Sequence, residues 1–295
     1  MVSVVITLYN KEKYVSECIQ SVIDQSFTDI EIIVVNDKTT DSSRDIVASF
    51  NDNRIKIIDN PENVGAGMSR RIGIEHATGK YIILLDADDY ISQDYIKVLV
   101  EHAEESDADI VSGNIITSNT KDNNYYHKRI LENGIYSTID EKLKFRKFES
   151  LSFINNKLIT KRLWDKVEYS ELRFTEDAPT YERLIYHANK IQNISNLESI
   201  YYYYRIVENS LMTSSNFIKR ITYQILYLYD TYAYFKSIDD LDYYDRIIVD
   251  KRNTVKYLQF FNAEKINHIQ HISSFEFDFK RCEEVCELLL EYLQQ

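Results

Sequence analysis

Two carboxylates, spaced two residues apart, follow an apolar run that has the pattern of a buried strand. They are Asp86 and Asp88, and the run before them is Lys80–Leu85. Because side chains at i and i+2 of a strand point to the same face, both carboxylates can face one ligand. A divalent metal bound together with a diphosphate would relieve their mutual repulsion, so the spacing predicts a binding site. The alternative is a helix cap, in which Asp88 or Asp89 precedes the next helix.

A cationic side chain near the start of a predicted helix is the second candidate. Arg70 ends a Gly-x-Gly-x-x-Arg sequence that begins at Gly65. The sequence imitates the phosphate-binding turn of dinucleotide folds, but Arg70 replaces the third glycine and the turn does not follow the first strand. An arginine near a helix N-terminus favours an anionic group such as a diphosphate. A surface arginine after a tight turn is the alternative interpretation.

Two further acidic positions are candidates. Asp37 directly follows the strand pattern Ile30–Asn36, and at this position its carboxylate can accept a hydrogen bond from a nucleotide base. Together with Asp41 it is also typical of a turn and helix cap. Asp177, in Glu176-Asp177-Ala178-Pro179, is an acidic candidate that is also typical of an ordinary cap for the helix that Pro179 begins. Each position taken alone is ambiguous.

The N-terminal third of the chain alternates strand and helix patterns, and this alternation predicts how the candidates are brought together. Strands are predicted at Ser3–Leu8, Ile30–Asn36, Arg54–Ile58, Lys80–Leu85 and Asp109–Ser112. Helices are predicted at Lys13–Gln25, Ser42–Phe50, Gly67–Ala77 and Gln93–Glu105. Strand–helix–strand repetition with continuously apolar strands predicts an α/β fold with a doubly wound, mostly parallel sheet. Ligands of such sheets bind beyond the carboxyl ends of the strands, so Tyr9, Asp37 and Asp86 should meet at one edge.

The pattern changes beyond residue 113. Residues Asn119–Glu132 are polar and predict a loop or hairpin. Helices are predicted at Glu141–Phe148, Lys161–Lys166 and Pro179–Lys190, a strand at Ile200–Arg205, and helix from Asn216 to the end. We therefore expect one domain over residues 1–215 and a helical C-terminal region, residues 216–295, that packs on it.

Composition narrows the classes of protein. The 295 residues carry a formal net charge of −12, which argues against nucleic acid as a partner because phosphate binding needs clustered Lys and Arg. No apolar run is long enough to span a bilayer, and three cysteines form no disulfide framework, so a cytoplasmic protein is expected. The C-terminal helices could form a homodimer or contact the inner face of a membrane peripherally. The 13 acidic and 10 basic residues after Asn216 provide no polybasic anchor for the membrane alternative.

Taken together, the motifs resemble the family-2 glycosyltransferases of the GT-A fold. Six elements of that family occur in order: Val4–Asn10, Glu31–Asp37, Asn63 to Gly73 with Gly65 and Arg70, Gly79–Asp89, Glu176-Asp177, and Tyr204-Arg205 with Asn209-Ser210. The resemblance covers residues 1–215. Thr7, Lys38, Ser69 and Arg71 depart from the usual pattern, and these departures put the selectivity for the donor's base in question rather than catalysis.

The resemblance implies roles for individual residues. Donor-binding residues would be Thr7, Tyr9, Glu12, Asp37, Asn63, Arg70, Asp86 and Asp88. Of these, Asp88 would ligate Mn²⁺ or Mg²⁺. Asp177 would be the catalytic base, and Glu176, Tyr204, Arg205 and Ser210 would lie on the acceptor or diphosphate side. We expect Tyr9 and Asp37 to lie at exposed strand ends rather than in the core.

The implied activity is inverting transfer of a sugar from a nucleotide-diphosphate donor, a UDP-sugar, to an acceptor hydroxyl. Glycan, lipid-linked and protein acceptors stay open, as does a role in cell-surface polysaccharide or glycoconjugate synthesis. A sugar-nucleotide nucleotidylyltransferase is an alternative, but it should carry a glycine-rich loop after the first strand, and Leu8–Glu12 contains no glycine. A catalytically dead protein that binds a sugar or a partner on the same scaffold is the other alternative.

Overall fold

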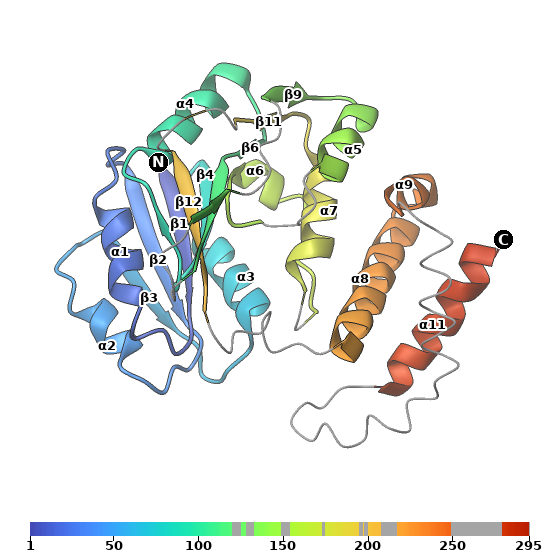
Figure 1. Ribbon diagram of the computed structural model, residues 1–295, viewed down its shortest axis with the longest axis horizontal. Helices are drawn as coiled ribbons and strands as arrows, with labels where there is room; N and C mark the ends of the chain where they lie inside the picture. Colours follow the sequence, from blue (N-terminus) through green and yellow to red (C-terminus); the bar gives the residue numbers. More distant parts are fainter. Residues whose placement is uncertain are drawn as a thin grey trace. The chain divides into compact units, whose positions relative to one another are not determined.

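The computed structural model describes residues 1–119, 125–127, 133–148, 154–172, 175–194, 197, 200–207, 217–248 and 279–294. The chain divides into two compact units, Met1–Ser210 and Leu211–Gln295. The first contains the sheets that carry the candidate site, and the second is helical in its described residues (Figure 1).

The main sheet of the first unit has eight strands in the order β3-β2-β1-β4-β10-β6-β11-β9. Their bounds are β1 Val2–Leu8, β2 Ile30–Asn36, β3 Ile55–Asp59, β4 Tyr81–Asp86, β6 Ile110–Ser112, β9 Gly134–Tyr136, β10 Lys157–Thr160 and β11 Ile191–Asn193. Strands β3, β2, β1 and β4 are parallel, whereas β10 runs antiparallel between β4 and β6. The predicted mostly parallel α/β sheet is confirmed.

The strand register decides which side chains meet at the edge of the sheet. Thr7 of β1 lies opposite Asp86 of β4, and Leu8 lies opposite Asn36 of β2. The residues that follow these strands therefore start from neighbouring positions. The predicted convergence of three strand ends at one edge is confirmed.

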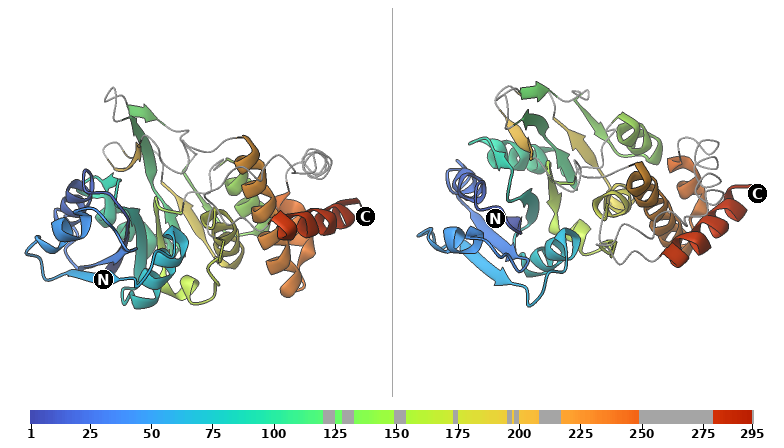
Figure 2. Two further views of the ribbon diagram at one scale, coloured as in Figure 1. Left: turned by 90° about the horizontal axis from the view of Figure 1, so that it is seen from below. Right: turned by 60° about the horizontal axis from the view of Figure 1, so that its bottom comes forward.

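Helices cover both faces of the main sheet (Figure 2). They are α1 Val15–Ile23, α2 Ser43–Ala48, α3 Ala66–His76, α4 Tyr95–Ser106, α5 Ile139–Phe148, α6 Lys161–Trp164 and α7 Asp177–His187. On one face Val4 packs with residues of α1 and α4, and on the other Val5 packs with residues of α3 and α7. A Cβ on Gly73 would lie 2.2 Å from Val5 Cγ1, so glycine lets α3 pack closely against β1.

A second sheet has the order β5-β12-β7-β8, with β5 Tyr90–Ile91, β7 Asn114–Asn119, β8 Tyr125–His127 and β12 Tyr201–Ile206. The expected strand at Ile200–Arg205 corresponds to β12. Residues 125–127 pair antiparallel with β7, which agrees with the hairpin alternative there, and the rest of 120–132 lies outside the described residues. The short β5 was not predicted, because two residues are too few for a periodic pattern.

The second unit contains α8 Phe217–Ser237, α9 Leu241–Ile247 and α11 Phe279–Gln294. Aromatic side chains join them: the ring of Tyr232 lies 5.5 Å from that of Tyr244 and 4.9 Å from that of Tyr292, between ring centroids. Within the residues that the structure describes, no helix is both long and apolar enough to cross a bilayer. The packing of this unit on the first stays a prediction.

Candidate active site

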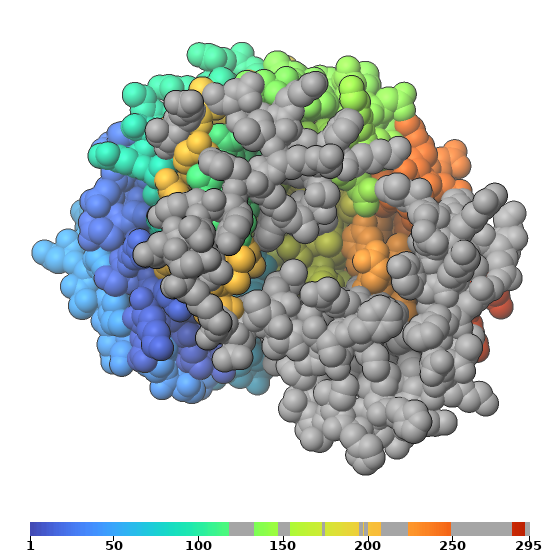
Figure 3. All heavy atoms as spheres, viewed as in Figure 1, coloured from blue at the N-terminus to red at the C-terminus, as the bar shows by residue number. Residues whose placement is uncertain are grey.

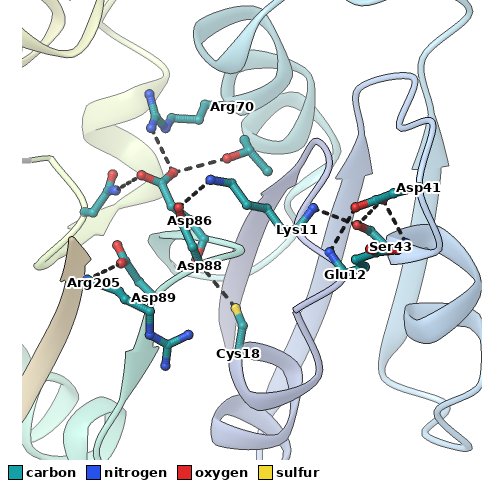
Figure 4. Close-up of polar contacts among 12 residues, drawn as sticks. Lys11, Glu12, Cys18, Asp41, Ser43, Arg70, Asp86, Asp88, Asp89 and Arg205 are labelled. Carbon is teal, nitrogen blue, oxygen red and sulfur yellow. Dashed lines mark hydrogen bonds and ion pairs between the residues drawn. The ribbon is translucent and has the colours of Figure 1, made fainter. Parts of the chain in front are cut away.

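Asp86, the last residue of β4, is the centre of a polar cluster at the edge of the main sheet (Figure 4). Its Oδ1 accepts hydrogen bonds from Thr7 Oγ1 at 3.2 Å and Arg70 Nη2 at 2.8 Å, and its Oδ2 accepts one from Asn155 Nδ2 at 2.8 Å. Burial opposes ionisation, but the charge and hydrogen bonds of these partners hold the pKa of Asp86 below its ordinary value. Asp86 is therefore an ionised carboxylate fixed from three sides.

Arg70 joins this carboxylate to a second acidic motif far away in the sequence. Its side chain leaves α3, and its Nη1 lies 2.6 Å from Glu176 Oε1 while its Nη2 binds Asp86. Arg70 is only 8% exposed, so the bridge is shielded from water. A Cβ on Gly67 would lie 2.3 Å from Glu176 Cγ, so the glycine of α3 makes room for this carboxylate.

Glu176 and Asp177 lie at the N-terminus of α7. Burial raises the pKa of Glu176 to about 7, and the nearby charge of Asp177 raises it as well. Burial also raises the pKa of Asp177, against the opposing charge of Arg70. Asp177 Oδ1 accepts a hydrogen bond from Ala178 N at 2.9 Å. The N-cap of α7 is Glu176 and Asp177 is the first residue of the helix, so the interpretation of Asp177 as the helix cap is wrong.

Asp88 forms an ion pair with Lys11 of the β1–α1 loop. Lys11 Nζ lies 2.5 Å from Asp88 Oδ2, with the two side chains 26% and 16% exposed. In the part of the chain that the structure describes, no three His, Cys, Asp or Glu side chains form a group that could hold a metal ion. A carboxylate oxygen is a suitable ligand for Mg²⁺ or Mn²⁺, so Asp88 fits the role of a single protein ligand whose partners come from a diphosphate and water.

The neighbouring Asp89 has a different task. It is buried, and its carboxylate accepts hydrogen bonds from Tyr202 Oη at 2.5 Å and Arg205 N at 2.8 Å. Burial and the charges of Asp86 and Asp88 raise its pKa well above its ordinary value. Through these two hydrogen bonds, Asp89 connects β12 to the segment that follows β4. The cap alternative for Asp88 and Asp89 is wrong, because Asp94 occupies the N-cap of α4.

Arg205 does not face Asp86 (Figure 4). Its guanidinium carbon lies 5.0 Å from the ring centroids of both Tyr14 and Tyr90, and its Nη2 lies 2.7 Å from Glu17 Oε2. Burial, together with the charges of Asp89 and Asp86, raises the pKa of Tyr204 above its ordinary value. Atoms of β12 reach the surface beside N-terminal residues (Figure 3). Ser210 lies outside the described residues.

Asp37 is buried, so the expectation that it lies exposed is wrong. Its Oδ1 accepts hydrogen bonds from Asn60 Nδ2 at 3.0 Å and Val64 N at 2.8 Å, and its Oδ2 accepts one from Gly65 N at 2.9 Å. Asn63 Nδ2 donates to the Asp37 carbonyl oxygen at 3.1 Å. Gly65 has a φ of 91°, a conformation that favours glycine. Asp37 and Asn63 thus hold the turn that leads into α3.

Tyr9 is exposed as expected, with 46% of its surface accessible. It lies on a loop fixed to the β2–α2 loop: Asn10 Oδ1 accepts a hydrogen bond from Thr40 N at 2.8 Å, and Glu12 Oε2 accepts one from Ser42 N at 3.2 Å. Asp41 accepts hydrogen bonds from the Ser43 side chain and from Glu12 N (Figure 4). Tyr9 therefore presents its ring from a rigid support. Glu12 contributes to that support.

Asn155 was not predicted from the sequence. It is 5% exposed and donates to Asp86, while its Oδ1 is buried and accepts no hydrogen bond from any described residue. It directly precedes Asn156 and strand β10, which inserts antiparallel next to β4. Only this insertion brings Asn155 to Asp86, and nothing in the local sequence pattern signals it.

Comparisons with known proteins agree with this arrangement. The profile of the family described as Glycosyl transferase family 2 matches residues 3–162. Glycosyltransferase GlyG of Streptococcus pneumoniae serotype 4 is 34% identical over 215 residues, 70% of this chain and 71% of that protein. The uncharacterized glycosyltransferase EpsJ of Bacillus subtilis (strain 168) is 31% identical over 219 residues, 72% of this chain but 62% of that protein, less than two thirds.

A solved structure has the same fold. The crystal structure of S. aureus TarS 1-349 in complex with UDP-GlcNAc matches with a TM-score of 0.62 at 19% identity, over 99% of this chain and 71% of that one. This likeness confirms the predicted GT-A type of α/β fold.

Proposed function

Because this chain belongs to glycosyl transferase family 2 and is a glycosyltransferase, we propose that it moves a sugar from a UDP-sugar to an acceptor hydroxyl, with inversion at the anomeric carbon. The observation that carries the proposal is the bridge made by Arg70. One guanidinium binds Asp86 at 2.8 Å and Glu176 at 2.6 Å. The bridge connects the acidic motif at the end of β4 to Glu176, the residue before the proposed base Asp177.

The proposed base is Asp177. An acceptor hydroxyl becomes a good nucleophile only as its proton is removed, and a positioned carboxylate can take that proton. The raised pKa of Asp177 favours this role, because a more basic carboxylate accepts a proton more readily. Attack of the hydroxyl oxygen on the anomeric carbon breaks the bond to the diphosphate in the same displacement. The electron pair leaves with the diphosphate, and the configuration inverts.

The donor would lie across the edge of the main sheet. Tyr9 would stack on the uracil, and Asp86 would accept a hydrogen bond from the ribose, while Thr7, Arg70 and Asn155 fix its carboxylate. Asp37, Asn63 and Glu12 would act on the donor site through the loops that they hold. Asp88 would hold Mn²⁺ or Mg²⁺, which when bound neutralises negative charge on the leaving diphosphate.

Relatives guide the choice of donor and acceptor. The structural neighbour TarS was crystallised with UDP-GlcNAc, so a hexosyl or N-acetylhexosaminyl donor is proposed. A glycan, lipid-linked or protein acceptor would approach from the Asp177 side, near Glu176, Tyr204, Arg205 and Ser210. A role in the synthesis of cell-surface polysaccharide, at the cytoplasmic face of the membrane, would fit such acceptors.

Donor hydrolysis tests the proposal without knowledge of the acceptor. Each UDP-sugar is incubated with the full chain and Mn²⁺ or Mg²⁺, and released UDP is measured with and without excess chelator. We expect slow, metal-dependent release from one donor, abolished by Asp88→Ala. Activity retained in excess chelator would contradict metal dependence. Pyrophosphate release from UTP and a sugar phosphate would favour the nucleotidylyltransferase instead, and a chain without any turnover would favour the dead scaffold.

A further inference from the structure

The ion pair between Lys11 and Asp88 places a protein cation on the carboxylate proposed to hold a metal (Figure 4). Lys11 Nζ lies 2.5 Å from Asp88 Oδ2, although 77 positions separate the two residues. Both side chains are largely shielded, at 26% and 16% exposure. The contact is therefore better protected from screening than an ordinary surface ion pair.

The backbone around Lys11 is held in place. Lys11 N donates to Ser43 Oγ at 2.7 Å, and Asn10 before it has a φ of 51° that its side-chain bond to Thr40 N at 2.8 Å supports. The lysine side chain thus starts from a fixed point opposite the end of β4.

The other two carboxylates of the β4 end have different partners. Arg70, Thr7 and Asn155 bind Asp86, whereas Tyr202 Oη and the backbone N of Arg205 bind Asp89. Among the described residues, Lys11 is the ion-pair partner of Asp88. Removal of Lys11 would leave Asp88 as an uncompensated carboxylate beside two others.

We propose that Lys11 is the resident counter-cation of Asp88 and keeps the divalent metal out until the nucleotide diphosphate arrives. The ammonium and the metal compete for one carboxylate, and two cations at such close range repel each other. A diphosphate supplies both the oxygen ligands that the metal needs and negative charge that offsets Lys11. The inference rests on the proposed function, since it takes Asp88 as the metal ligand. Metal and donor would then bind together, rather than the metal first.

Direct binding of Mn²⁺, followed by the EPR signal of the free ion, tests the proposal on the full chain without nucleotide. The variants are Lys11→Met, which keeps the length of the side chain, and Lys13→Met, which removes the same charge from an exposed position nearby. We expect Lys11→Met to bind Mn²⁺ about 10- to 100-fold more tightly than wild type, because the variant removes the repulsion between the ammonium and the metal ion. Lys13→Met should bind it as wild type does. Adding Asp88→Asn to Lys11→Met should abolish the tight site.

Equal Mn²⁺ affinity in wild type and Lys11→Met would overturn the proposal, as would equal tightening in Lys13→Met or a tight site that survives Asp88→Asn. The same titration with UDP present separates this failure from failure of the proposed function. UDP should tighten Mn²⁺ binding to wild type far more than to Lys11→Met. If UDP tightens Mn²⁺ binding to both equally, the metal site stands and the role of Lys11 falls. If UDP has no effect on either, the proposed metal–donor site itself is contradicted, and this inference with it.

Discussion

Arg70 Nη1 lies 2.6 Å from Glu176 Oε1, although the two residues are 106 positions apart in the sequence. Arg70 belongs to α3, and Glu176 is the N-cap residue of α7. Because Arg70 also binds Asp86, one buried cation connects the proposed donor site to the motif that contains the proposed base. In the described part of the chain, the carboxylates of Asp86, Glu176 and Asp177 share the positive charge of Arg70. The raised pKa values of Glu176 and Asp177, caused first by burial, are consistent with this sharing of positive charge.

Arg70→Met should destabilise the protein strongly. It leaves two shielded carboxylates without their cation, and breaking a buried ion pair by removing one partner costs about 3–5 kcal/mol. The measurement is the free energy of unfolding from urea titration. Arg71→Met is the matched control, since Arg71 is 36% exposed and its ion pairs lie at the surface. That control should cost less than about 1 kcal/mol. If both variants lower the free energy of unfolding by a similar amount, the Arg70 bridge stabilises the protein no more than a surface ion pair does.

Asp177→Asn distinguishes a catalytic base from a merely structural role at the start of α7. Asn keeps an oxygen that can accept the hydrogen bond from Ala178 N, so the melting temperature should change little in either case. If Asp177 is the base, transfer should fall by at least roughly a hundredfold while UDP-sugar affinity is retained. Steady-state kinetics, calorimetry and thermal unfolding provide the three readouts. Transfer within a few-fold of wild type would leave Asp177 a structural role and make Glu176 the next candidate base.

Tyr9→Ala and Asp37→Ala should fail in different ways. Tyr9 is exposed, so its loss should leave the melting temperature unchanged and weaken UDP binding by the value of one base–aromatic stack, about 1–3 kcal/mol. Asp37→Ala removes the acceptor of Val64 N and Gly65 N, so it should lower the melting temperature as well as UDP affinity. Calorimetry with UDP and thermal unfolding check both. An unchanged melting temperature in Asp37→Ala would contradict the structural role.

Glu176→Gln should change how stability depends on pH. The pKa of Glu176 is raised from 4.5 to about 7, so between these values the folded chain holds a proton that the unfolded chain releases. The free energy of unfolding therefore loses the Glu176 contribution as pH rises through this window. Gln resembles the protonated form and cannot ionise. The variant should match wild type near pH 4.5 and exceed it above pH 7 by on the order of 2 kcal/mol.

Urea titrations across this pH range measure the effect. Glu75→Gln, at a position 57% exposed on its side chain, is the control and should run parallel to wild type. A Glu176→Gln curve that also stays parallel to wild type would show that the pKa of Glu176 is not raised.

The sequence by itself determined the framework of this protein. Continuously apolar runs such as Ile30–Asn36 are typical of strands that are buried on both faces. Because these runs alternate with amphipathic helical segments, the sequence predicts a parallel sheet with helices on both faces. Parallel strands put their carboxyl ends at one edge, so the convergence of the ends of β1, β2 and β4 followed from the pattern alone. Short strands such as β5 could not be predicted, because two residues are too few to show a hydrophobic periodicity.

Only the tertiary structure decided which partner each charged side chain takes. Nothing in local spacing connects Lys11 to Asp88, Arg70 to Glu176 or Asn155 to Asp86, because ion pairs form between residues that different elements bring within a few ångströms. The burial of Asp37 was misjudged for the same reason: the turn that covers it comes from a segment 27 and 28 positions later. Apolar periodicity is a local property, so it can be recognised from neighbouring residues in the sequence. Burial and pairing of single charges depend on packing, and they set the chemistry of this site.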